Sequence, residues 1–193
     1  NGEILDCETL VLAIGHSARD TFELLYEKEL NIEAKSFAVG LRVQHPQSMI
    51  NMSQYGKKAA DILLTASYKL TTKSSAARGV YSFCMCPGGY VVNASTEKEK
   101  LAINGMSYHD RKSESANSAI IVTIDAKDFS DKTPLAGMYF QQELESKCYK
   151  AGNSYIPVQL LGDFIKGRES MKFGETKPCF KGKYTFSRLD KIL

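Results

Sequence analysis

A nearly continuous apolar run near the start of the chain, Thr9–Ile14, constrains the fold most, because it ends abruptly at Gly15. A run of this kind is typical of a strand that is covered on both faces of a parallel or mixed sheet. Ser17 then stands as a helix N-cap with Asp20 three residues later, and the apolar residues that follow recur at helical spacing. The sequence therefore predicts a strand, a glycine and a helix over residues 18–29, which is the start of an α/β unit.

The rest of the chain reads as a β-rich region followed by helices. Alternating residues predict a strand over 37–45 that ends at Pro46, and short helices over 49–55 and 59–64. Further strands are expected at 68–72, 79–85, 89–94, 101–105 and 119–124. A helix capped by Thr133 should run to Gly152, and a shorter one should span 158–166.

These elements predict an α/β protein with an α+β insertion. Residues 1–34 would be the terminal piece of a dinucleotide-binding domain, and 35–166 an inserted β-rich domain with packed helices. Residues 167–193 are polar, rich in Gly, Lys and Pro, and offer few core positions, so we expect a connector there.

Charge and cysteine usage narrow the function classes. The net charge of +3 comes from 25 basic and 22 acidic residues that are interspersed, so we expect no nucleic-acid partner. No apolar run approaches the ~20 residues of a membrane helix, so we expect no membrane partner either. The five cysteines are odd in number and scattered, which fits a reducing cytoplasm better than a disulfide framework.

The turn at the first helix is a candidate binding site for an anion. Free N–H groups of a first helical turn and the guanidinium of Arg19 suit a phosphate-bearing ligand. The alternative is an ordinary strand-to-helix turn, since most helix N-termini hold only water or a cap.

Five separated strings carry a resemblance to a known family. They are Leu12–Phe22, Phe37–Pro46, Gly79–Val92, Asn104–Ser107 and Ala116–Ala119. In this order they resemble a family of largely uncharacterised bacterial FAD-dependent dehydrogenases, and Val11–Gly15 looks like the strand that returns to the flavin in two-dinucleotide flavoproteins. The resemblance implies a middle section of such an enzyme, with Gly15, His16, Ser17 and Arg19 beside FAD.

The pyrophosphate loop of such a cofactor site is missing from the chain. No two of the fourteen glycines are separated by a single residue, so the Gly-x-Gly-x-x-Gly turn is absent. Gly162 and Gly167 have the spacing of a nucleotide-phosphate loop, but Arg168 and Glu169 stand where Lys and Ser or Thr are needed.

The string Cys84-Met85-Cys86-Pro87-Gly88-Gly89 is a second candidate site. Residues two apart in a strand project to one face, so both thiols should point the same way. A metal site is not expected, because no second pair of ligands stands at zinc spacing. We expect reduced thiols that pack beside a hairpin turn, with a redox disulfide as the alternative. The resemblance implies instead that this loop, with Asn104, lines the pocket that faces the flavin and the substrate.

The histidines give no catalytic arrangement. Arg42 and His45 are three apart in a strand and so face opposite sides, while His16 and His109 lie in turns or loops. For a flavoprotein this is no obstacle, since the cofactor performs the hydride chemistry.

The sequence therefore predicts part of an FAD-dependent oxidoreductase, inactive by itself, that supplies the substrate-side domain. Its partners would be the remainder of its own chain and an unknown small-molecule substrate or electron partner. The alternative is a non-catalytic module that binds a partner or an anionic ligand.

The first prediction concerns this chain alone. Because it lacks the pyrophosphate loop, we expect calorimetric titration with FAD to give a dissociation constant above about 1 μM, which corresponds to roughly 8 kcal/mol. Tighter binding would contradict the assignment to a middle section.

Overall fold

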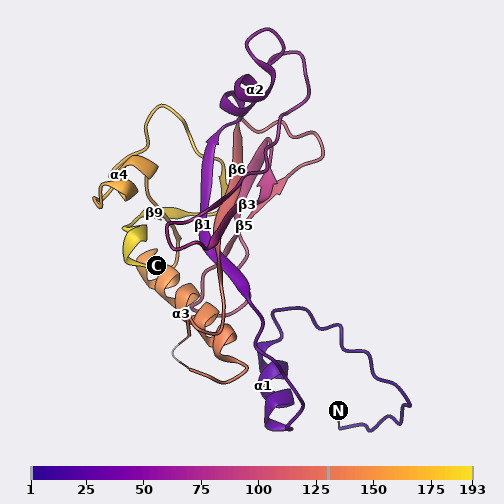
Figure 1. Ribbon diagram of the computed structural model, residues 1–193. Coiled ribbons are helices and arrows are strands. Elements are labelled where there is room, and N and C mark those ends of the chain that lie inside the picture. The colour runs from indigo at the N-terminus through magenta and orange to yellow at the C-terminus, as the bar shows by residue number, and fades with distance from the viewer. Residues whose placement is uncertain (1, 130, 193) are drawn as a thin grey trace. The chain divides into compact units, whose positions relative to one another are not determined.

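The computed structural model describes residues 2–129 and 131–192 and divides the chain into two compact units, Asn1–Glu33 and Ala34–Leu193. Its mixture of helices and several sheets confirms the expected α/β class (Figure 1). The elements in chain order are α1 (Arg19–Glu27), β1 (Phe37–Pro46), α2 (Gln47–Tyr55), β2 (Thr71–Lys73), β3 (Gly79–Cys86), β4 (Gly89–Asn93), β5 (Ile103–Ser107), β6 (Ser115–Ile124), α3 (Ala136–Ala151), β7 (Ile156–Val158), α4 (Leu161–Ile165), β8 (Phe180–Lys181), β9 (Tyr184–Phe186) and the 3-10 helix η1 (Leu189–Lys191). Among the described residues, no helix combines the length and apolarity needed to cross a bilayer.

In the first unit, helix α1 forms but the strand expected over Thr9–Ile14 does not. Leu10 and Val11 are 73% and 80% exposed, and no described strand pairs with this run. A strand leaves its backbone donors and acceptors unpaired without a neighbour, so an apolar sequence alone does not hold one. The predicted cap is also wrong, because Ala18 precedes the helix and no side chain caps it.

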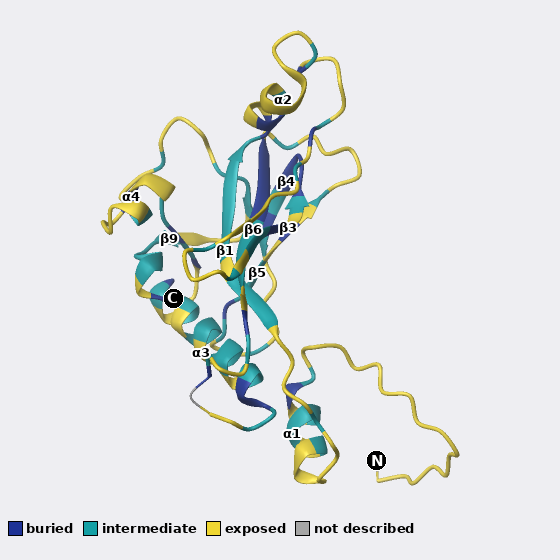
Figure 2. Cartoon of the chain, in the orientation of Figure 1, coloured by how far each residue is buried: buried dark blue, intermediate teal, exposed yellow. Residues whose placement is uncertain are grey.

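A four-stranded antiparallel sheet in the order β1-β6-β3-β2 organises the second unit. Strands β1 and β6 pair over their whole length, from Phe37 opposite Ile124 to Pro46 opposite Ser115. Figure 2 shows buried residues gathered along β6, which has a partner on each side. Strand β6 is therefore the centre of the sheet, and its first four residues are all buried.

A small apolar cluster packs against each end of β6. Ala116 packs with Ile50 of α2 and with Ala66, while Tyr68 and Met85 lie against them. At the other end Ile124 packs with Phe129 and Ala136, together with Phe37, Val39 and Phe140. Two apolar clusters of this unit thus lie at the two ends of one strand.

Strands β3 and β4 belong to different sheets, which overturns the expected hairpin at Pro87–Gly89. Strand β3 pairs with β2 and β6, whereas β4 pairs with β5 and with β8. The turn therefore carries the chain from one sheet to the next, and β7 and β9 form a third, parallel pair.

The helical predictions hold where the apolar period is long. Helices α2, α3 and α4 lie within two or three residues of the expected spans. At α3 the residue before the helix is Leu135, without a side-chain cap, so the expected Thr133 cap is wrong. The segment 59–64 forms turns instead of a helix, with Ile62 and Leu64 more than 80% exposed.

The polar tail after residue 166 carries more structure than its composition predicted. It provides β8, β9 and η1, and Ile192 is 4% exposed. The ring of Phe173 lies 4.9 to 6.4 Å, between centroids, from those of Phe180, Tyr184 and Phe186. These aromatic rings form a local cluster, in which the three Phe residues are half-buried and Tyr184 is exposed. The tail is therefore more structured than expected, although Ile192 is the one buried apolar residue among its described positions.

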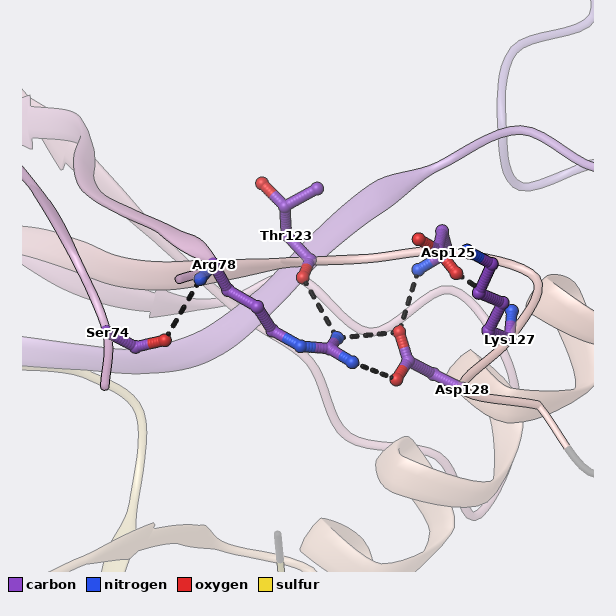
Figure 3. Close-up of polar contacts among 6 residues, drawn as sticks. All are labelled: Ser74, Arg78, Thr123, Asp125, Lys127 and Asp128. Carbon is purple, nitrogen blue, oxygen red and sulfur yellow. Dashed lines mark hydrogen bonds and ion pairs between the residues drawn. The ribbon is translucent and has the colours of Figure 1, made fainter. Parts of the chain in front are cut away.

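An ion pair joins the turn before β3 to the turn after β6. Both guanidinium nitrogens of Arg78 donate to the Asp128 carboxylate, at 2.7 and 2.5 Å, and Arg78 also donates to the Thr123 carbonyl (Figure 3). The same carboxylate accepts the backbone N–H of Asp125 at 2.9 Å. Mainly through the hydrogen bonds from Arg78, the pKa of Asp128 falls from 3.8 to about 2.

The second prediction follows from this shift. A carboxylate with a lowered pKa in the folded state stabilises the fold above its unfolded pKa, and the contribution disappears as pH falls towards the folded value. In urea unfolding, Asp128→Asn should therefore be less stable than the wild type at neutral pH, and the difference should shrink between about pH 4 and pH 2. Asp110→Asn, in an exposed pair with Lys112 at 3.9 Å, is the control and should change little.

Candidate functional site

Arg42 and Asn117 form a polar contact across the middle of the main sheet. Arg42 of β1 lies opposite Ala119 of β6, so Asn117, two residues along, projects from the same face. The guanidinium Nη1 donates to the Asn117 Oδ1 at 2.6 Å, and Asn117 is fully buried. The amide Nδ2 of Asn117 is buried and has no hydrogen-bond partner among the described residues.

A bulge in β3 brings two thiols to this contact. The register between β3 and β6 shifts between Phe83 and Cys86, and Cys84 has a φ of 47°. The Cys84 carbonyl accepts a hydrogen bond from Arg42 Nη1 at 3.2 Å. The sulfurs of Cys84 and Cys86 lie 3.9 Å apart, so the thiols are neighbours, as expected, but through a bulge and not a regular strand.

Strand β5 of the second sheet completes the cluster. The Asn104 Oδ1 accepts from Arg42 Nη2 at 3.3 Å and lies 3.8 Å from the Cys84 sulfur. A Cβ added at Gly105 would lie 2.8 Å from the Cys86 sulfur and would clash with Arg42 Nη1 and the Asn117 Oδ1. Five polar side chains around a glycine therefore form what we call the Arg42 cluster, which comprises Arg42, Cys84, Cys86, Asn104 and Asn117.

The Pro87-Gly88-Gly89 turn lies beside the cluster but is buried. The Gly88 N–H donates to the Gln47 Oε1 at 2.8 Å, and Ser107 Oγ donates to the Pro87 carbonyl at 2.7 Å. Gly88 has a φ of 51°, and a Cβ there would collide with the Arg111 carbonyl. These glycines make room for protein backbone, whereas Cys84 is exposed.

Arg42 also borders a cavity of about 320 Å³ between the sheet and α3. The walls are mainly apolar and include Val39, Leu41, Ala119, Ile121, Leu144 and Ile192. Gln141 and Glu145 of α3 add polar groups. Mostly apolar walls with a few polar side chains are typical of sites for small molecules.

The pKa of the buried thiol, Cys86, is set by burial and by its two neighbours Cys84 and Arg42. Burial raises the pKa of Cys86, and the neighbouring Cys84 raises it further, while Arg42 lowers it.

His45 lies apart from the cluster, with its Nε2 2.9 Å from the Tyr68 hydroxyl. Burial lowers the pKa of His45 and raises that of Tyr68, so both are neutral near pH 7 and serve packing.

The other predicted group, Gly15, His16, Ser17 and Arg19, lies in the first unit. Gly15 has a φ of 73° and nothing within 4 Å of where a Cβ would stand. The Ser17 hydroxyl lies 3.5 Å from the His16 Nε2, and Arg19 is 6% exposed. Their contact with a cofactor stays a prediction.

The sequence interpretation selected Cys84, Cys86 and Asn104 and missed the two residues at the centre of the cluster. Arg42 and Asn117 lie inside strings that carried the family resemblance, and Arg42 follows the apolar and small residues that begin β1. A charged residue such as Arg42 is unusual on a half-buried strand, and this could have marked it as a candidate site residue. Among the described residues, no three His, Cys, Asp or Glu side chains gather as metal ligands would.

Two comparisons place this chain among known proteins. The family model described as "FAD-dependent protein, C-terminal domain-like" matches residues 36–193. An uncharacterized protein of Clostridium beijerinckii is 50% identical over 197 residues, which cover 100% of this chain and 37% of the relative. The chain thus spans little more than a third of that relative's length.

The third prediction concerns the packing at Gly105. Gly105→Ala should force Arg42 and Asn117 apart and lower the free energy of unfolding by about 1–3 kcal/mol, the usual cost of overpacking. Chemical denaturation measures the loss. Gly162→Ala, in helix α4 with nothing within 4 Å of the added methyl group, is the matched control and should be neutral or slightly stabilising. Equal stability of both variants would contradict the close packing of the cluster.

Proposed function

This chain belongs to the FAD-dependent protein C-terminal domain-like family, and we propose that it supplies the substrate-side domain of an FAD-dependent oxidoreductase of the dehydrogenase class. In this proposal the unit Ala34–Leu193 covers the flavin, and the remainder of the same polypeptide binds most of the cofactor. A small-molecule substrate or electron partner reacts between them, since ligand pockets favour domain interfaces.

The observation that carries this proposal is that a strained cysteine and a buried amide donor, unpaired in the described part of the chain, occur together in the Arg42 cluster, beside an apolar cavity. Cys84 holds a left-handed backbone conformation, and Asn117 keeps a buried amide donor without a partner among the described residues. Each feature costs about 1–3 kcal/mol. Such costs gather at functional sites, where a residue is kept for its chemistry and not for stability.

The cluster offers defined binding chemistry. A guanidinium has five N–H donors, and three hydrogen bonds from Arg42 are made to the Cys84 carbonyl, Asn104 and Asn117. The remaining donors and the apolar cavity beside Arg42 suit a substrate with an apolar body and a carbonyl or carboxylate oxygen.

The first unit fits one edge of a cofactor site. The positive φ of Gly15 and the open space around it leave the backbone accessible to a ligand that approaches closely. When bound, FAD would supply the hydride chemistry. The role of this chain would be to orient the substrate through Arg42 and to bound the cofactor at Gly15, His16, Ser17 and Arg19.

Exposed apolar residues support contact with the remainder of the polypeptide. In the first unit Ile4, Leu5, Leu10 and Val11 are each more than 70% exposed. In the second unit the segment after α2 exposes Ile62 and Leu64 by more than 80%. Large apolar residues that stay this exposed, close together in the sequence, are candidates for contact with a further protein surface.

The test of the proposed function uses the full-length polypeptide that contains this chain. It should bind FAD and show flavin absorbance that bleaches on anaerobic reduction. If the Arg42 cluster faces the flavin, Arg42→Met should lower the flavin midpoint potential, because a nearby cation stabilises the reduced, anionic ring. Arg111→Met removes an exposed arginine outside the cluster and should leave the potential unchanged. A full-length protein that binds no FAD, or equal potentials in both variants, would overturn the proposal.

The fourth prediction tests the turn in the first unit. In the full-length protein Arg19→Ala should weaken FAD binding by about 1.5–3 kcal/mol, the range for a hydrogen bond to a charged group. Arg19→Lys should recover part of the loss, because it keeps the charge without the fork of donors. Lys28→Ala, exposed just beyond α1, is the control. Because Arg19 is buried, the thermal stability of each variant is measured as well. Unchanged affinity for FAD at matched stability would show that Arg19 does not bind the phosphate.

A further inference from the structure

Cys84 and Cys86 lie close enough to react with each other. Their sulfurs are 3.9 Å apart, and a disulfide requires about 2.05 Å, so the two sulfurs are in contact and must approach further to form a bond. Both are free thiols, and they sit on one strand at a bulge, where the backbone is not held by a regular ladder. The short distance between the sulfurs and the bulge therefore make these two thiols a candidate pair for a bridge.

The two thiols differ in their access to solvent. Cys84 is exposed, whereas Cys86 is 7% exposed and its S–H donates to the Cys84 carbonyl at 3.3 Å. An exposed thiol can attack a molecule from solution, and a buried neighbour can attack only the sulfur beside it. This asymmetry gives Cys84 the role of the attacking thiol and Cys86 that of the resolving thiol.

Burial and the neighbouring Cys84 keep the pKa of Cys86 above its ordinary value, and Arg42 limits that rise. The thiolate is the nucleophile in disulfide exchange, and burial alone would suppress it at Cys86. Arg42, which is hydrogen-bonded to the Cys84 carbonyl, lowers the pKa of Cys86 and so opposes the effect of burial. Arg42 is thus a positioning residue for the pair.

We propose that Cys84 and Cys86 form a redox-active dithiol that exchanges with small-molecule disulfides. The Cys84 thiolate attacks one sulfur of the substrate disulfide and releases the first thiol. The Cys86 thiolate then attacks the Cys84 sulfur and displaces the second thiol. One disulfide and one dithiol become one intrachain disulfide and two free thiols, so two electrons pass to the substrate. The inference stands on the thiol geometry and does not require the flavin.

The experiment treats the reduced full-length polypeptide with glutathione disulfide and then alkylates the remaining thiols. Cleavage after Arg78 and Lys98 gives a peptide of residues 79–98 that contains both cysteines, so mass analysis reads this pair separately from Cys7, Cys148 and Cys179. We expect the wild-type peptide to lose two hydrogens, and added dithiothreitol to restore both thiols. A peptide that keeps two alkylatable thiols, or carries a stable glutathione, would overturn the proposal.

Variants separate the two roles. Cys86→Ser and Cys86→Ala should both trap one glutathione on Cys84, and Cys84→Ser should leave Cys86 unmodified. Arg42→Met should slow bridging and accumulate the mixed disulfide, because a smaller share of Cys86 would be thiolate without the guanidinium. Arg111→Met is the control. Because the readout is peptide mass, it is independent of flavin content, so failure here and failure of the proposed oxidoreductase function are distinguishable.

Discussion

The hydrogen bond from Arg42 to Asn117 is the interaction on which the Arg42 cluster of the second unit depends. It crosses the two longest strands, and the same guanidinium reaches the bulge of β3 through the Cys84 carbonyl and the second sheet through Asn104. A half-buried cation in a sheet is stable only when its donors find acceptors. The four strands β1, β3, β5 and β6 must therefore keep their places for this one side chain, and Gly105 must stay without a Cβ so that they can meet.

A second buried side chain, Gln47, fixes the turn that connects the two sheets. Its Oε1 accepts the Gly88 N–H, and its Nε2 donates to the Ala66 carbonyl at 2.9 Å and to Asn51 at 2.8 Å. The tight turn at Gly88 therefore has its backbone donor satisfied from the first residue of α2. Because the turn follows Cys86 directly, the same contacts fix the end of the strand that carries both thiols.

Sequence patterns predicted elements well where a period extends over many residues, as in β1, β6 and α3. They failed where structure depends on partners distant in the sequence. Strands β8 and β9 have two and three residues and carry no periodic signal, yet they form because β4 and β7 offer them backbone groups. The run Thr9–Ile14 has the signal of a buried strand and no described partner. Of the site, Cys84, Cys86 and Asn104 were visible as a string, while Arg42 and Asn117 meet only through the β1–β6 register.

The two units differ in whether contacts within the unit are enough to hold its secondary structure. The second unit closes its sheet at both ends with the clusters around Ala116 and Ile124, so it holds its register by contacts within residues 34–193. The first unit has one nine-residue helix and an exposed apolar run, and a helix of that length is marginal in water by itself. The run Thr9–Ile14 can thus form a strand only where neighbouring strands supply its hydrogen bonds. The same neighbours would also fix the position of the Gly15 backbone.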